Sequence, residues 1–104
     1  MTLDQIVVGV ASYIEQEIAA PAPTGVQKFA YYAAVPFVSK TILQMGTQYK
    51  SLAMSMGILD DKGNWDISEL RNAAIEAIKK TGPFQFAGII VRSEDIDKLC
   101  SYLN

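Results

Sequence analysis

The sequence predicts an α-rich α+β fold in which a helix, a long kinked helix, a third helix, a short β-hairpin and a last helix follow one another. Apolar residues recur at helical spacing over most of the chain. The one β-like stretch is 84–92, where two apolar runs flank Gly88. Of the 104 residues, 50% are hydrophobic and 19% are charged, so a single globular domain over residues 1–104 is expected.

The first helix is predicted to run from Thr2 to Ala20. Thr2 and Gln5 form the T-x-x-Q pattern of a capping box, which satisfies two amides at a helix start. Pro21 and Pro23 cannot continue the helix, and they leave a short, stiff connection. Such a connection predicts that the first helix packs antiparallel to the next one.

The central stretch, Val26–Met56, contains no acidic residue and carries a heptad pattern, which places its apolar positions on one stripe of a helix. We call these positions the heptad seam: Tyr31, Val35, Val38, Ile42, Met45, Tyr49, Leu52 and Met56. Pro36 lies inside the pattern and removes one helical amide, so a kink or a break near residues 34–35 is expected. The seam keeps its phase across Pro36, which favours a kink in one helix that runs to Met56.

The C-terminal half begins with a turn-rich connector over residues 58–65. Asp66 is the predicted N-cap of the third helix, with Glu69 completing a D-x-x-E box. Gly82 follows the last turn of that helix and stops it. After the hairpin, Ser93 is the predicted cap of the last helix.

Charge is divided unevenly between the first two predicted helices. Residues 1–27 carry acids only, and residues 28–59 carry bases only. The groups are Asp4, Glu15 and Glu17 on the first segment and Lys28, Lys40 and Lys50 on the second. Opposite signs favour pairing of the two segments within a chain or across a dimer, although exposed pairs contribute only about 0.2–1 kcal/mol each.

Composition and charge argue against several classes of protein. The net charge is −2 and the pI is about 4.9, so the chain offers no basic surface for nucleic acid. The apolar run 29–38 is shorter than the roughly 20 residues that a membrane-spanning helix needs. The N-terminus lacks the basic region of a signal peptide. We therefore expect a cytoplasmic protein with no nucleic acid and no membrane among its partners.

The sequence contains no constellation typical of catalysis or metal binding. It has no histidine, which removes Cys–His pairs, and its one cysteine, Cys100, lies on the apolar face of the last predicted helix. Placing Asp60 first in a calcium loop puts Lys62, Trp65 and Arg71 where an oxygen ligand, the turn glycine and the bidentate glutamate belong. We therefore predict no catalytic residue, no metal site and no cofactor.

The aromatic residues of the central stretch have two interpretations. They line a ligand pocket, or they form core with their hydroxyl groups at its rim; the second interpretation is favoured because apolar stripes at helical spacing usually pack. These residues are Phe29, Tyr31, Tyr32, Phe37 and Tyr49. Tyr31 and Tyr32 lie about 100° apart on one helix, so one of them is expected outside the core, where it marks a contact surface.

These observations favour a non-enzymatic interaction or structural protein that self-associates as a homodimer through the central helix, or that binds another protein. The predicted interface residues are Tyr31, Tyr32, Val35, Val38, Ile42, Met45, Tyr49, Leu52 and Met56. The alternative is a small binding protein that holds an apolar ligand in a pocket between the central helix and the C-terminal hairpin.

The second half of the chain also carries a resemblance. The pieces 60–64, 66–70, 80–82 and 95–99 form a series of turns and helix caps. This layout is similar in style to small proteins of bacterial prophages and mobile elements. The resemblance implies no activity and no catalytic residue.

Overall fold

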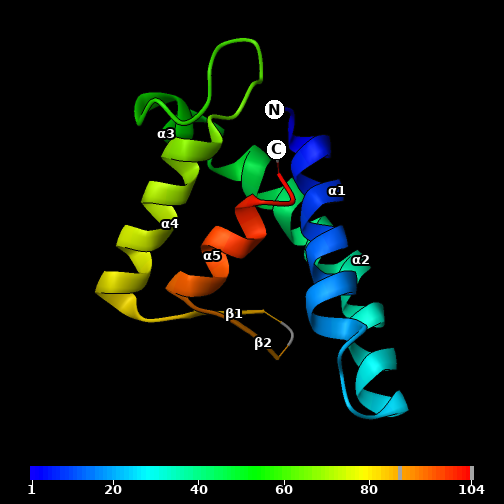
Figure 1. The fold of residues 1–104 in the computed structure, drawn as a ribbon. Coiled ribbons are helices and arrows are strands. Elements are labelled where there is room, and N and C mark those ends of the chain that lie inside the picture. Colours follow the sequence, from blue (N-terminus) through cyan, green and yellow to red (C-terminus); the bar gives the residue numbers. More distant parts are fainter. Residues whose placement is uncertain (87, 104) are drawn as a thin grey trace.

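A computed structural model describes residues 1–86 and 88–103 of the chain (Figure 1). In chain order the elements are α1 (Leu3–Tyr13), the π-helix η1 (Ile14–Ala19), α2 (Gly25–Gln48), α3 (Lys50–Ser55), α4 (Ile67–Thr81), β1 (Phe84–Phe86), β2 (Ile89–Val91) and α5 (Ser93–Cys100). This order confirms the α-rich α+β fold. It differs from the prediction in the π-helix and in the division of the central helix.

The first helix begins as its capping pattern predicts. The Thr2 hydroxyl accepts a hydrogen bond from the Gln5 amide at 3.3 Å, and the Gln5 side chain accepts one from the Thr2 amide at 2.9 Å. Both halves of the capping box are therefore present. The helical path ends at Ala19, one residue before the predicted end, and its last six residues form the π-helix.

The central helix passes through Pro36 and ends at Gln48. The prediction of a single helix to Met56 is wrong, because Tyr49 leaves the helical backbone region and α3 starts after it. Two residues near the end of α2 explain why the helix is interrupted there. Gly46 is a poor helix former, and the Thr47 hydroxyl bonds back to the Leu43 carbonyl at 3.1 Å, a contact that bends helices.

The C-terminal half follows its local signals, with one exception. Asp66 accepts a hydrogen bond from the Glu69 amide at 3.1 Å and so caps α4. The strands pair antiparallel, with Gln85 opposite Ile90. The exception is α5, whose N-cap is Arg92 and not the predicted Ser93. The Arg92 amide donates a hydrogen bond to the Asp95 carboxylate at 2.9 Å, so the side chain of Asp95 satisfies an amide at the start of this helix.

The main core lies where α1, η1, α2 and the hairpin meet. Its buried members are Tyr13, Ile14, Ala34, Val38 and Ile89. A second cluster of Ala53, Ile58 and Leu59 ties α3 to the connector and to α4. Figure 1 shows α1 lying along α2 on one side and α5 standing between α1 and α4. None of the residues of α4, all of them described, is buried.

Two glycines allow α1 to approach its neighbours closely. A Cβ on Gly9 would lie 2.5 Å from the Leu103 side chain and 2.6 Å from the Tyr102 carbonyl oxygen. A Cβ on Gly46 of α2 would lie 2.5 Å from the Leu3 side chain. In both places a side chain fills the space that a larger residue would need, so α1 packs tightly on α2 and on the C-terminal end.

Gly9→Ala tests the close approach at α1. Helix propensity alone would make the alanine variant more stable by about 1 kcal/mol. The backbone carbonyl of Tyr102 cannot move aside as a flexible side chain can, so we expect the free energy of unfolding to fall by about 1–3 kcal/mol. Urea unfolding followed by circular dichroism measures the change.

Gly25→Ala is the matched control. Gly25 opens α2, and a Cβ placed there meets nothing within 4 Å among the described residues. We expect a small gain of about 0.4–1 kcal/mol in the free energy of unfolding. A Gly9→Ala variant as stable as the Gly25→Ala variant would contradict the packing of α1 against the C-terminal end.

Candidate functional site

The structure divides the predicted interface residues between three environments. Val38 is buried in the main core, and Tyr31, Val35 and Ile42 pack against that core. Tyr32 is exposed on another side of α2. The remaining four, Met45, Tyr49, Leu52 and Met56, are 44–55% exposed and line a cleft. The first half of the seam is thus used within the chain, and the second half faces an open apolar space.

This cleft has a volume of about 440 Å³. Its walls come from the N-terminal helix, from α2 and α3, from α4, from the hairpin and from α5. The lining includes Leu3, Ile6, Ile14, Val38, Ile42, Met45, Tyr49, Leu52, Met56, Trp65, Leu70, Ala73, Ala74, Phe84, Ile89, Val91, Ile96 and Leu99. All the surface that these described residues present to the cleft is apolar. Its size is within the range of about 300–1,000 Å³ usual for small-molecule sites.

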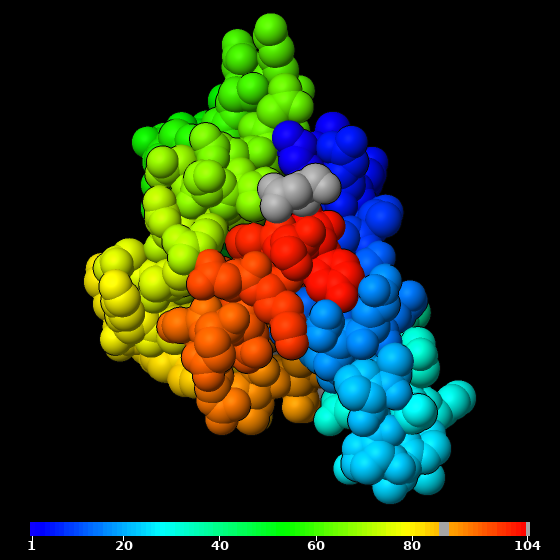
Figure 2. Space-filling model, viewed as in Figure 1, coloured from blue at the N-terminus to red at the C-terminus, as the bar shows by residue number. Residues whose placement is uncertain are grey.

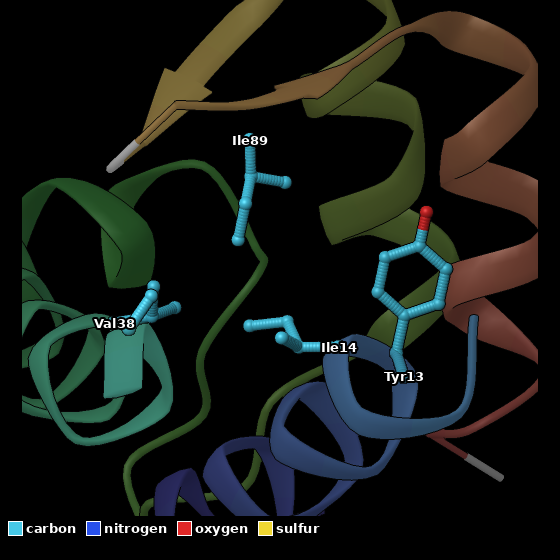
Figure 3. Packing of buried hydrophobic residues seen from close by; sticks show 5 residues of the cluster. Tyr13, Ile14, Val38 and Ile89 are labelled. Carbon is cyan, nitrogen blue, oxygen red and sulfur yellow. The ribbon is translucent and has the colours of Figure 1, made fainter. Parts of the chain in front are cut away.

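The inner end of the cleft meets the main core. In Figure 3, Ile14 and Val38 approach each other from η1 and α2, Ile89 reaches toward them from the hairpin, and Tyr13 lies beside them. The cleft therefore has a closed apolar end at the core. Its open end lies at the exposed residues Met45, Leu52 and Met56.

A second apolar surface covers the N-terminal half of α2, on the side away from α1. Val26 is 81% exposed, Phe29 76% and Phe37 58%. Tyr32 and Ala33 are exposed between them. Figure 2 shows the end of the molecule where η1 meets α2, coloured blue to cyan, protruding at the lower right. We call Val26, Phe29, Tyr32, Ala33 and Phe37 the outer face of α2.

Polar contacts hold α5 between its neighbours. The Tyr102 hydroxyl donates to the Glu17 carboxylate at 2.7 Å, and Lys98 forms an ion pair with the same carboxylate at 3.2 Å. Tyr102 also packs edge-on against Tyr13, with ring centres 5.9 Å apart. The hydrogen bond from Tyr102, and then the contact with Lys98, hold the pKa of Glu17 below its usual range. These contacts join the C-terminal end to η1.

On the other side of α5, Arg71 of α4 pairs with Asp97 at 2.6 Å. That contact lowers the pKa of Asp97 and raises the pKa of Arg71. No ion pair among the described residues joins the acidic segment 1–27 to the basic segment 28–59. Lys28, Lys40 and Lys50 are exposed.

Cys100 and Asp60, which the sequence offered as a nucleophile and a metal ligand, have structural roles in the fold. Burial raises the pKa of the Cys100 thiol, which disfavours the thiolate that a nucleophile needs. The amide of Asn64 lowers the pKa of Asp60, whose carboxylate also accepts from the Lys62 amide at 2.9 Å. Asp60 thus closes a turn. Across residues 1–86 and 88–103, no three acids or cysteines gather as metal ligands would.

Comparisons with known proteins give no family for this chain: no protein-family model, no curated protein and no solved structure matches it. The similarity to prophage proteins stays a prediction. Within the described ranges, no helix combines the length and the hydrophobicity that crossing a membrane requires.

Sequence reasoning missed the outer face of α2. The favoured interpretation of the central aromatics as core is wrong for Phe29 and Phe37, which are exposed. A signal was present, because residues 29–38 are apolar on every side of the helix except at Lys28 and Lys40, which flank them. A helix that is apolar on every side has more apolar surface than one neighbouring helix can cover.

Glu17→Gln tests the contact between η1 and the C-terminal end. Because the pKa of Glu17 is lower in the folded chain than its ordinary value of 4.5, its carboxylate stabilises the fold above that value, and this contribution is lost as the pH falls through the lowered pKa. We expect the variant to melt at a lower temperature than the parent at about pH 7, and the difference to disappear as the pH falls below 4.5 and through the lowered pKa of Glu17.

Glu76→Gln is the control for this pH dependence. Glu76 pairs with Lys79 on the exposed side of α4, one turn away on the same helix. Removing this exposed pair is expected to change the melting temperature little at any pH. Equal losses in the two variants would show that the Glu17 carboxylate has no special role.

Proposed function

We propose that this chain is a non-enzymatic interaction protein that forms a homodimer through α2. One observation carries the proposal: α2 is apolar on two opposite sides, and only one of them is covered within the chain. Ala34 and Val38 are buried on the inner side, while Val26 and Phe29 are more than three-quarters exposed on the outer side. Exposed apolar surface concentrated on one helix face is typical of a protein–protein contact.

The outer face has a pattern that is complementary to itself. Phe29 and Phe37 lie four residues before and after Ala33, so the order along the helix is large, small, large. If two copies of α2 pack antiparallel about a two-fold axis at Ala33, each Phe29 meets the partner's Phe37 and the two alanines meet at the centre. Small residues at the centre of a helix pair allow close approach, and a two-fold contact uses the same patch twice.

Charge makes this contact sensitive to salt in an unusual direction. In the antiparallel pair, Lys40 of one copy lies opposite Val26 of the other copy and within about one turn of that copy's Lys28. The lysine stem can cover the valine, but the two ammonium groups repel each other. Salt screens this repulsion and leaves apolar burial intact, so the dimer is expected to strengthen as ionic strength rises.

Phe29→Asp and Phe37→Asp test the homodimer. Each places a charge in the proposed contact, and both positions are exposed in the single chain, so folding is expected to persist. Light scattering over a hundredfold range of concentration is expected to show a dimer for the parent and a monomer for both variants. Ile42 is unsuitable for this purpose because it packs against the main core.

Gln44→Asp is the matched control, since Gln44 is an exposed position of α2 beyond the outer face. It is expected to leave the dimer intact, and circular dichroism verifies that all variants keep their helices. A parent chain that is monomeric at every concentration would overturn the proposal.

Ala33→Cys tests the two-fold axis separately, in a Cys100→Ala background. Mild oxidation is expected to join two copies at Ala33, because residues on the axis face each other within disulfide reach. Gln44→Cys serves as control, since its two copies would lie about 33 Å apart along the pair. If the chain is a dimer but neither variant crosslinks, the proposal of a homodimer stands and the antiparallel geometry is refuted.

A further inference from the structure

We infer that the apolar cleft binds a single-chain amphiphile, with an unbranched aliphatic tail inside and an anionic head group at the mouth. This inference goes beyond self-association. The outer face of α2 and the cleft lie on different sides of that helix, so one can act without the other.

The lining selects an aliphatic tail. Every part of the surface that the described lining residues present to the cleft is apolar. A hydroxyl, amide or charge placed deep in such a space would lose its hydrogen bonds to water and gain none in return. The tail must therefore be hydrocarbon over its full buried length, and any polar group of the ligand must remain at the open end.

The volume favours a chain over a helix from another protein. A six-carbon ring fills an engineered cavity of about 150 Å³, or about 25 Å³ per carbon, so the 440 Å³ of this cleft have room for roughly 17 carbons. Two turns of helix with a diameter of about 10 Å occupy about 850 Å³. A helix does not fit, whereas a tail of 12 to 16 carbons, on the order of this capacity, does.

The walls suit a flexible chain. Met45 and Met56 at the open end are unbranched and adapt to irregular shapes. Ala73 and Ala74 on α4 are small, so the wall that they form leaves room for a tail beside the second cluster, against which Ala73 packs. The closed end at Ile14 and Val38 sets the depth to which a tail can reach.

The charge at the mouth favours an anionic head group. Tyr49 and Leu52 line the open end, and Lys50 lies between them in the sequence. From Thr41 to Leu59, the stretch that forms this wall, Lys50 is the one charged residue, and the sequence has no acid there. None of the described ion pairs engages Lys50. Lys50 therefore favours a carboxylate over a quaternary ammonium at this end.

The probe for the test is tetradecanoate, used below its micelle concentration, with tetradecyltrimethylammonium as the cationic match. Trp65 is the only tryptophan and lines the cleft, so its fluorescence reports occupancy directly. We expect saturable binding of one tetradecanoate per chain with a blue shift of the emission. The cationic probe is expected to bind more weakly.

Three variants sharpen the test. Ala74→Phe fills the cleft and is expected to weaken tetradecanoate binding by more than about tenfold, the equivalent of two buried methylene groups. Lys50→Glu is expected to weaken binding of the anionic probe by about fivefold and to spare the cationic one. Lys28→Glu, at the far end of α2, is the control and is expected to change neither.

The outcomes separate the parts of the inference. Absence of saturable binding by either probe overturns the site, and equal affinity for both probes overturns the anionic head group. If Ala74→Phe does not fold, the Lys50→Glu and Lys28→Glu pair still decides the question, because both residues are exposed. Binding is expected to persist in the Phe29→Asp variant; its loss there would show that the cleft forms only in the dimer and would overturn a site within one chain.

Discussion

The structure depends on the close packing of α1 between two neighbours. Leu3 fills the space at Gly46 of α2, and the C-terminal Leu103 fills the space at Gly9 of α1. Both contacts are possible because glycine has no side chain, and together they fix α1 on two of its faces. The buried residues Tyr13 and Ile14 then reach the core from the end of the same helical path. The position of the core therefore follows from two glycines more than from any single large residue.

The other half of the molecule is held differently. The helix α5 is joined to η1 through Glu17 and to α4 through Arg71, and both contacts are made by exposed or half-exposed polar groups. Such groups fix direction well but contribute little free energy each. The helices α1, η1 and α2 contribute buried residues, whereas α4 contributes none. The cleft lies at the boundary between these two regions, which explains why so many elements contribute to its walls.

The sequence predicted what depends on neighbours within one or two turns. The cap at Thr2, the cap at Asp66 and the hairpin around Gly88 all rest on local hydrogen bonds or on local backbone freedom, and these positions are confirmed. It failed where the outcome depends on distant partners. The seam has the same spacing from Tyr31 to Met56, so spacing alone could not show that the residues up to Ile42 pack in the core while those from Met45 onward face a cleft.

The same limit applies to the candidate site. Phe29 and Phe37 are as apolar as any core residue, but they lie on a side of α2 that α1 does not cover. In the sequence, Gly9 is only a residue of low helix propensity inside a helix. Its packing role is not visible there, because Leu103, which fills the space beside it, is more than ninety positions away. The sequence shows the hydrophobic residues that line the cleft, but the volume of the cleft depends on how the N-terminal helix, α2, α3, α4, the hairpin and α5 meet.

The absence of fully buried residues in α4 has a consequence for how the chain fluctuates. This helix is held by the packing of Leu70 and Ala73 and by the Arg71–Asp97 ion pair, so its amide protons are expected to exchange with solvent through local openings below the free energy of global unfolding. The amides of α2 near Ala34 and Val38 would exchange only when the whole core opens. Local opening of α4 would then widen the cleft, because α4 forms one of its walls.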